Sequence, residues 1–214
     1  MMHAVRTLIA YLAALTLLHG CVAINFERGS DMPVAAARQL AQSTQVTVEG
    51  MVTVASGTLD DGFAVQDGSG GIYVTRTIGT PVKPGQRARV SGTLVAPNQQ
   101  VAIDPATIEF LGTGSVPAPP EVKTGAVGPA TDGRLIAVRG KVAGDVIDDQ
   151  PWGCKVYVND GSGQLLVFIA AATRIDVNVF RTAQPLRVIG FSGRYERHAE
   201  LLPRAQSDIT ILQN

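Results

Sequence analysis

The two halves of the chain carry the same sequence landmarks in the same order, and this repeat constrains the fold more than any other feature. The landmarks are a valine segment with a glycine, an Asp-Gly-Ser-Gly loop, an Arg-Val-x-Gly segment and a closing isoleucine segment. They lie at residues 48–50, 67–70, 89–92 and near 108 in the first half, and at 138–140, 160–163, 187–190 and near 209 in the second. Self-similarity of this kind predicts a duplicated structural unit.

Each half reads as a series of short β-strands. Runs such as "VTVEGMVTVA", "GIYVT" and "RARVSGTLV" are separated by turn residues, and the chain holds 23 glycines and 12 prolines to supply the turns. Gly50 and Gly140 interrupt the first strand of each half, as expected where a strand bends around a barrel. Five strongly bent strands fit an OB-type Greek-key barrel better than an immunoglobulin sandwich, which has seven or more strands.

The first twenty residues predict a secretory signal. Arg6 supplies the positive charge, and an apolar run too short to span a membrane follows at 8–18. The segment Leu18-His19-Gly20-Cys21 resembles a bacterial lipobox, so Cys21 is the predicted lipidation site. The alternative is a soluble export signal, which leaves a Cys21–Cys154 disulfide open. Both predict export, and we expect a periplasmic or outer-membrane lipoprotein of the cell envelope, held to the membrane through a lipid anchor.

The expected organisation is therefore all-β, with two consecutive five-stranded OB-type barrels after an export signal and a short tether. A short helix is expected in the tether after Asp31, with Pro33 near its start. The predicted boundaries are a signal peptide at 1–20, a tether at 21–44, a first barrel at 45–124, a linker at 125–133 and a second barrel at 134–214.

A family resemblance supports this organisation. The string "VEGMVT … GFAVQDGSGGIYV … VKPGQRARVSGTL … IDPATIEFLGTGSVPAP" resembles bacterial OB-fold modules found in exported proteins and beside secreted nucleases. The resemblance covers residues 46–120 well and 135–214 more loosely, because the second hairpin and the strand after it differ in length. It implies the fold and, since such modules are usually inferred to bind nucleic acid, a nucleic-acid ligand. It implies no catalytic site.

The two Asp-Gly-Ser-Gly loops allow three interpretations: a metal loop, a phosphate cradle or a turn between strands. A calcium loop needs further oxygen ligands and a closing glutamate, and neither Asp67 nor Asp160 is followed by them. A P-loop leads from a strand into a helix and ends in Lys-Ser/Thr, whereas both of these segments lead from strand to strand. We therefore interpret both loops as hairpin turns.

The sequence favours binding over catalysis. His3 and His19 lie in the predicted signal, which leaves His198 as the one histidine of the mature chain. No zinc signature is present, and Ser69 and Ser162 lack the context of a catalytic nucleophile. We expect no enzymatic activity, no metal and no cofactor.

Candidate binding residues follow from the alternation of side chains along strands. If Val156 and Val158 point inward, Lys155 and Tyr157 point outward. By the same rule, Tyr73 points outward near Arg76. Trp152 either joins this surface or plugs one end of its barrel. The predicted ligand-binding set is Tyr73, Arg76, Lys155, Tyr157, Arg194, Tyr195 and Arg197.

Aromatic and basic side chains on an OB barrel suit single-stranded nucleic acid, because bases stack on rings while cations contact phosphates. The 18 basic and 18 acidic side chains balance, so no overall attraction to nucleic acid is expected, although the second half is the more basic one. The predicted ligand is single-stranded nucleic acid on the second barrel. The alternative is an envelope scaffold that binds a protein or a polysaccharide.

Overall fold

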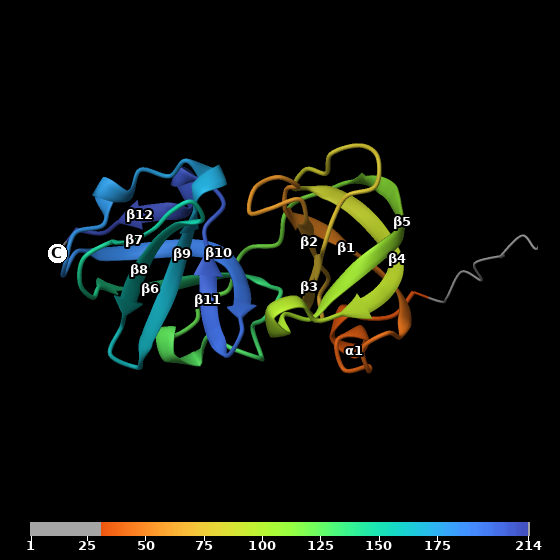
Figure 1. The fold of residues 1–214 in the computed structure, drawn as a ribbon, viewed down its shortest axis with the longest axis horizontal. Coiled ribbons are helices and arrows are strands. Elements are labelled where there is room, and N and C mark those ends of the chain that lie inside the picture. The colour runs from red at the N-terminus through yellow and green to blue at the C-terminus, as the bar shows by residue number, and fades with distance from the viewer. Residues whose placement is uncertain (1–30, 214) are drawn as a thin grey trace, which may run out of the picture.

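The computed structural model describes residues 31–213, which form two β-barrels side by side (Figure 1). The predicted signal peptide and Cys21 lie outside the described residues. The first barrel is closed in the strand order β1-β2-β3-β5-β4, with β3 and β5 parallel and the other pairs antiparallel. Its elements are α1 (Val34–Ala37), β1 (Gln45–Val54), β2 (Phe63–Gln66), β3 (Gly71–Val74), β4 (Gln86–Val95), the 3-10 turn η1 (Pro97–Gln99) and β5 (Ala102–Thr113).

The second barrel repeats this topology with one added strand and with its last strand in two parts. Strands β6-β8-β9-β11-β10 close in the same order, and β9 and β11 form the parallel pair. The short strands β7 and β12 extend the sheet by pairing with β8 and β10. The elements are η2 (Thr124–Ala126), β6 (Leu135–Val142), β7 (Ile147–Asp149), β8 (Gly153–Asn159), β9 (Gln164–Ala170), η3 (Ala171–Thr173), η4 (Val177–Val179), β10 (Pro185–Tyr195), β11 (His198–Leu202), η5 (Gln206–Asp208) and β12 (Ile209–Ile211). The predicted all-β fold of two OB-type barrels is confirmed.

The last strand differs between the two barrels. In the first barrel β5 pairs with β4 along its whole length, with a register shift where Pro105 lies opposite Gly92. In the second barrel Pro203 ends the pairing after Leu202, the turn η5 intervenes, and β12 resumes on β10 at Ile209. Strands β11 and β12 together therefore take the place of β5.

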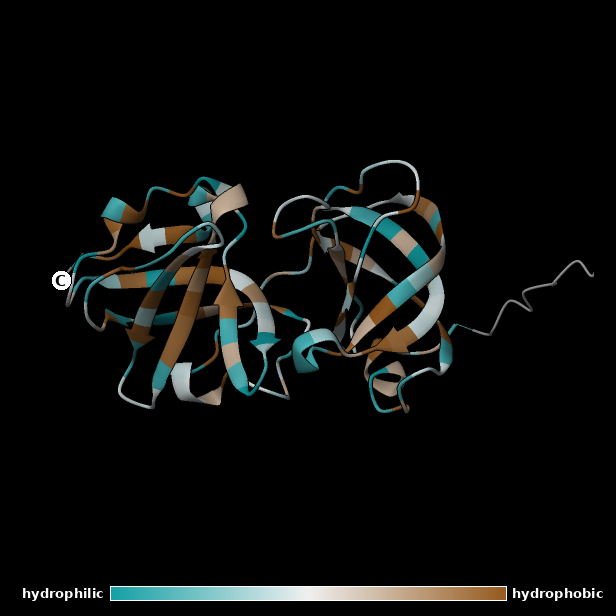
Figure 2. Ribbon diagram, viewed as in Figure 1, coloured by the Kyte–Doolittle hydropathy of each residue, from teal (hydrophilic) through white to brown (hydrophobic). Residues whose placement is uncertain are grey.

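Alternating valine, isoleucine and leucine side chains fill the two barrels. Along β4, every second residue from Ala88 to Leu94 is buried, and Figure 2 shows hydrophobic and hydrophilic positions alternating on this strand. A Cβ at Gly50 would lie 2.9 Å from the Gln66 carbonyl oxygen, and one at Gly140 would lie 2.9 Å from the Asn159 carbonyl oxygen. Both glycines are required at these bends, because the backbone of the neighbouring strand, β2 or β8, passes too close to leave room for a Cβ.

Residues 31–38 pack on the first barrel, although the sequence places them in a tether. Met32 forms a parallel bridge with Val48, and Val34 and Ala37 of the expected short helix are fully buried. In the second barrel, Glu121 forms the same kind of bridge with Ala137. The structural repeat therefore begins before the first strand of each barrel.

The Asp-Gly-Ser-Gly loops hold these leading segments. In the first barrel, the Val34 N–H donates to Asp67 Oδ2 at 2.9 Å, and the Ala35 N–H donates to Ser69 Oγ at 3.0 Å. In the second, the corresponding donors are the N–H groups of residues 124 and 125, which reach Asp160 at 3.4 Å and Ser162 at 2.9 Å. Both loops are hairpin turns, as predicted, and each also binds the start of its own repeat.

The two barrels contact each other through an apolar cluster. Phe191 and Leu202 of the second barrel pack against side chains of the first that include Val54, Ala64, Tyr73 and Ala102. Polar contacts surround this cluster: the Leu135 N–H donates to Gln66 Oε1 at 2.9 Å, and Arg204 donates to the Thr53 carbonyl oxygen at 2.7 Å. Between residues 31 and 213, no helix has the length and hydropathy that crossing a membrane would require.

Candidate ligand-binding face

In the first barrel, the second barrel covers the outer face of β2 and β3. Every residue of these two strands is buried, including those that point away from the barrel core. Figure 1 shows β2 and β3 on the side of the first barrel that faces the second. This face is the one that OB folds commonly use for ligands. In the first barrel this face is not open to a ligand, because the second barrel packs on it.

Tyr73 consequently lies inside the contact between the barrels. Its ring lies 5.5 Å from that of Phe191, its hydroxyl donates to Asp60, and it is 9% exposed. Burial, together with the nearby Asp60 carboxylate, raises the pKa of Tyr73 well above its usual range. Tyr73 points outward from its own barrel, as predicted, but the second barrel covers the outer side of β3, so its ring is not open to a ligand.

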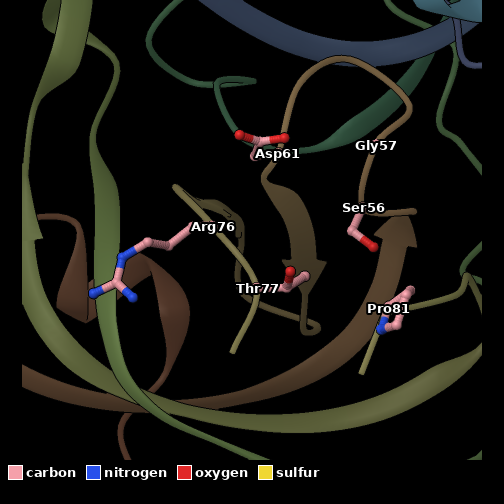
Figure 3. A pocket seen from close by; sticks show the side chains of 6 residues that line it. All are labelled: Ser56, Gly57, Asp61, Arg76, Thr77 and Pro81. Atoms are coloured by element: carbon pink, nitrogen blue, oxygen red, sulfur yellow. The ribbon is translucent and has the colours of Figure 1, made fainter. Parts of the chain in front are cut away.

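Arg76 lies on the first barrel, two residues after the end of β3. Its guanidinium lies 3.0 Å from Asp104 and donates to the Pro105 carbonyl oxygen at 3.1 Å. An open hollow of about 430 Å³ adjoins it, and Figure 3 shows the guanidinium directed away from Ser56 and Pro81 on the opposite wall. The hollow is lined by Ser56, Gly57, Asp61, Arg76, Thr77 and Pro81.

The second barrel leaves its corresponding face open. Val156 and Val158 are fully buried in the core, so Lys155 and Tyr157 point outward from β8, as predicted. Strand β9 is hydrophobic on both sides over most of its length (Figure 2). Its inward residues are buried, and its outward residues are half-buried, which leaves apolar surface exposed beside Tyr157.

Outward side chains of four neighbouring strands form this surface, which we name the β8–β9 face. Tyr157, Leu166 and Glu200 face one another across β8, β9 and β11. Lys155 lies opposite Phe168 on β9 and opposite Ile147 on β7. Figure 1 shows β8, β9 and β11 side by side on the near side of the second barrel. The members are Ile147, Lys155, Tyr157, Leu166, Phe168 and Glu200.

Lys155 is the cation at the centre of the face. Its Nζ lies 2.8 Å from the Asp149 carboxylate, and this hydrogen bond raises the pKa of Lys155, with smaller contributions from Tyr157 and Tyr195. The ring of Tyr195 is 53% exposed at the end of β10. The structure therefore brings together three of the seven predicted residues, namely Lys155, Tyr157 and Tyr195.

The two remaining arginines differ from each other. The Arg194 Nε lies 3.1 Å from Asp132, a buried carboxylate that also has Arg38 at 3.9 Å, so Arg194 takes part in the contact between the barrels. Arg197 is exposed in the turn between β10 and β11 and forms no ion pair within residues 31–213. Arg197 is therefore exposed and unpaired within residues 31–213, whereas the Arg194 guanidinium is held by Asp132.

Glu200 is a member of the face that the sequence reasoning missed. It is half-buried, and no group in the part of the chain that the structure describes donates a hydrogen bond to its carboxylate. Burial raises the pKa of Glu200 to about 7, against the opposing influence of Lys155. The alternation around Leu201, which points into the core, is the signal that could have placed Glu200 outward.

Trp152 is 72% exposed in the turn between β7 and β8, so the alternative that it plugs the barrel is wrong.

No group of three or more histidine, cysteine, aspartate or glutamate side chains is placed to hold a metal ion among residues 31–213. Cys154 is partly buried and packs against the core of the second barrel. The side chains of the β8–β9 face are thus aromatic and apolar, apart from the Lys155 ammonium and the Glu200 carboxylate.

Comparison with known proteins gives distant structural likeness alone. No family model and no curated protein matches the chain. Among solved structures, a murine DNA-binding protein bound with double-stranded DNA is 10% identical, with a TM-score of 0.37 over 78% of this chain and 97% of that one. The single-stranded DNA-binding protein from Thermus aquaticus is 16% identical, with a TM-score of 0.30 over 81% of this chain and 95% of that one.

A replication protein A heterotrimer bound to single-stranded DNA is 13% identical, with a TM-score of 0.29 over 86% of this chain and 51% of that one. At such TM-scores the assignment of the fold rests on the strand order and pairing of the two barrels themselves.

Proposed function

We propose that the protein binds single-stranded nucleic acid on the β8–β9 face of its second barrel. One observation carries the proposal: the two barrels share a topology, yet the first has its face covered while the second exposes aromatic rings around a cation. Tyr157 and Phe168 on the face, together with Tyr195 at the end of β10, offer flat surfaces on which bases stack, at about 1–3 kcal/mol for each stacked base. The face therefore has the rings that this kind of ligand requires.

Electrostatic attraction contributes little in this proposal. Lys155 shares its charge with Asp149, and Arg197 is the nearby exposed arginine without an ion pair in the described part of the chain. A site with about two phosphate contacts loses affinity with salt at a logarithmic slope of roughly −1.4. We expect a shallow salt dependence, since most of the binding free energy comes from stacking.

Fluorescence anisotropy with a labelled deoxythymidine oligonucleotide tests the proposal. Tyr157→Ala and Phe168→Ala are each expected to weaken binding by about 1–3 kcal/mol, or roughly 5- to 150-fold. Phe110→Ala is the matched control, because Phe110 is a 40% exposed aromatic residue on β5 of the first barrel. Absence of binding, or an equal loss in all three variants, would overturn the proposal.

A protein or polysaccharide partner is the second candidate. The observation that favours it is the apolar character of the face, where Leu166 and Phe168 are outward and Ile147 is 49% exposed. Such a surface can bind a partner without nucleic acid. If no oligonucleotide binds while Phe168→Ala abolishes capture of an envelope component, the scaffold function replaces the first proposal.

We also propose that the chain is exported and anchored through Cys21. The support is the positively charged and apolar pattern of residues 1–20 and the lipobox-like segment before Cys21. Mass spectrometry of the mature N-terminus is expected to show a lipid-modified cysteine as the first residue. A mature chain that begins elsewhere, or that carries an unmodified Cys21, would refute the anchor.

A further inference from the structure

The carboxylate of Glu200 lies on the β8–β9 face without a partner. Glu200 faces Leu166 on β9 and Gly193 on β10, so an apolar side chain lies on one side of it and no side chain on the other. No hydrogen-bond donor reaches it from residues 31–213. Partial burial removes some of the water that would solvate this carboxylate, and no protein donor among residues 31–213 replaces it. A donor brought by a ligand would do so.

The spacing of the strands puts Glu200 within reach of the edge of a base that would stack on Tyr157. Tyr157, Leu166 and Glu200 form one row across three adjacent strands, which spans about 10 Å at the usual separation of strands. A base that lies over Leu166 and against the Tyr157 ring extends its edge toward Glu200. The carboxylate is then placed to read that edge.

The Watson–Crick edges of the bases differ in what they offer to a carboxylate. An ionised carboxylate accepts hydrogen bonds and donates none. Guanine presents two adjacent donors, N1–H and the N2 amino group, which match the two carboxylate oxygens. Thymine presents a single N3–H between two carbonyl oxygens, which repel a carboxylate. Adenine and cytosine each present one donor beside a ring nitrogen lone pair.

We infer that Glu200 is the specificity-determining residue of the β8–β9 face and that it selects guanine among the bases of a single strand. This inference rests on the proposed binding of nucleic acid, to which it adds a preferred base. Glu200 accepts hydrogen bonds from guanine N1–H and N2–H while the ring stacks on Tyr157. Unpaired bases are commonly recognised by stacking combined with hydrogen bonds to this edge.

Deoxythymidine oligonucleotides with one central substitution test the inference at pH 8, where most of the carboxyl is ionised. The central nucleotide is guanosine, inosine, which lacks the N2 amino group, or thymidine. The wild-type protein is expected to bind the guanosine oligonucleotide roughly 5- to 150-fold more tightly than the thymidine one, with inosine between them. Glu200→Gln is expected to remove most of this preference while it retains binding of the thymidine oligonucleotide.

Glu196→Gln is the matched control, because it makes the same change of charge at an exposed residue in the turn between β10 and β11. It is expected to keep the guanosine preference. Equal binding of all three oligonucleotides by the wild-type protein would overturn the inference and leave the proposed function in place. A preference that survives Glu200→Gln would also overturn it. Absence of binding to every oligonucleotide would overturn both.

Discussion

At the scale of single residues, the same side-chain type has opposite roles in the two barrels. Tyr73 on β3 and Tyr157 on β8 both point away from a barrel core. Tyr73 is buried against Phe191 and donates to Asp60, so it stabilises the contact between the barrels. Tyr157 remains at the surface, where a ligand can reach it. Their difference comes from what lies opposite each ring.

Glu200 is expected to lower the stability of the free protein above neutral pH. Its pKa is raised by burial from 4.5 to about 7, so the folded state favours the protonated form more than the unfolded state does. Its favourable contribution is complete below about pH 4.5 and is lost as the pH rises through 7. We predict that Glu200→Gln raises the melting temperature at pH 8 and flattens its decline between pH 5 and pH 8.

Thermal unfolding followed by circular dichroism across this pH range measures the effect. Glu196→Gln again serves as the control, since its exposed position predicts an unchanged profile. A wild-type melting temperature that does not fall as Glu200 ionises would contradict the prediction.

At the scale of elements, the hairpin loops connect parts of the chain that the sequence keeps apart. Asp67 accepts hydrogen bonds from the N–H groups of Ser69 and Gly70 within the turn, and from that of Val34 at the start of α1. Asp160 accepts from Thr124 and Ser162 in the same manner. The Asp-Gly-Ser-Gly motif resembles a ligand-binding loop, but its carboxylate accepts hydrogen bonds from the backbone of its own repeat.

Asp67→Ala is predicted to destabilise the first barrel by about 1–2 kcal/mol, because several backbone donors lose their acceptor. Although burial alone would raise the pKa of Asp67, the hydrogen bonds from Ser69, Val34 and Gly70 lower it overall. The stabilisation is therefore present at neutral pH and lost as the pH falls and Asp67 becomes protonated. Urea unfolding at pH 7 measures the loss. Asp67→Asn, which keeps one acceptor oxygen, should lose less, and an equal loss would contradict the account.

At the scale of the whole molecule, the contact between the two barrels involves apolar side chains and also a close approach of two backbone segments. A Cβ placed on Gly71 would lie 2.0 Å from the carbonyl oxygen of Gly133, which belongs to the segment that leads into the second barrel. No side chain larger than hydrogen fits there. Gly71 therefore sets how closely the two barrels can pack.

Gly71→Ala is predicted to separate the barrels while both remain folded. Gly68→Ala is the matched control, because a Cβ at Gly68 in the same hairpin has nothing within 4 Å. We expect Gly71→Ala to increase the radius of gyration in small-angle scattering and to expose Tyr73 to solvent in tyrosine fluorescence. A compact Gly71→Ala protein with Tyr73 still buried would contradict this prediction.

The sequence by itself determined the duplication, the five-stranded barrels and the outward direction of Lys155 and Tyr157. These follow from local patterns, since side chains alternate along a strand and glycine is required where strands cross closely. The tertiary structure alone decided that Tyr73 is buried, that Arg194 is paired with Asp132 and that Glu200 lies opposite Leu166. Each of these depends on which surface of one barrel meets the other, or on strands distant in the sequence. Alternation assigns a side of a strand, but it does not say what covers that side.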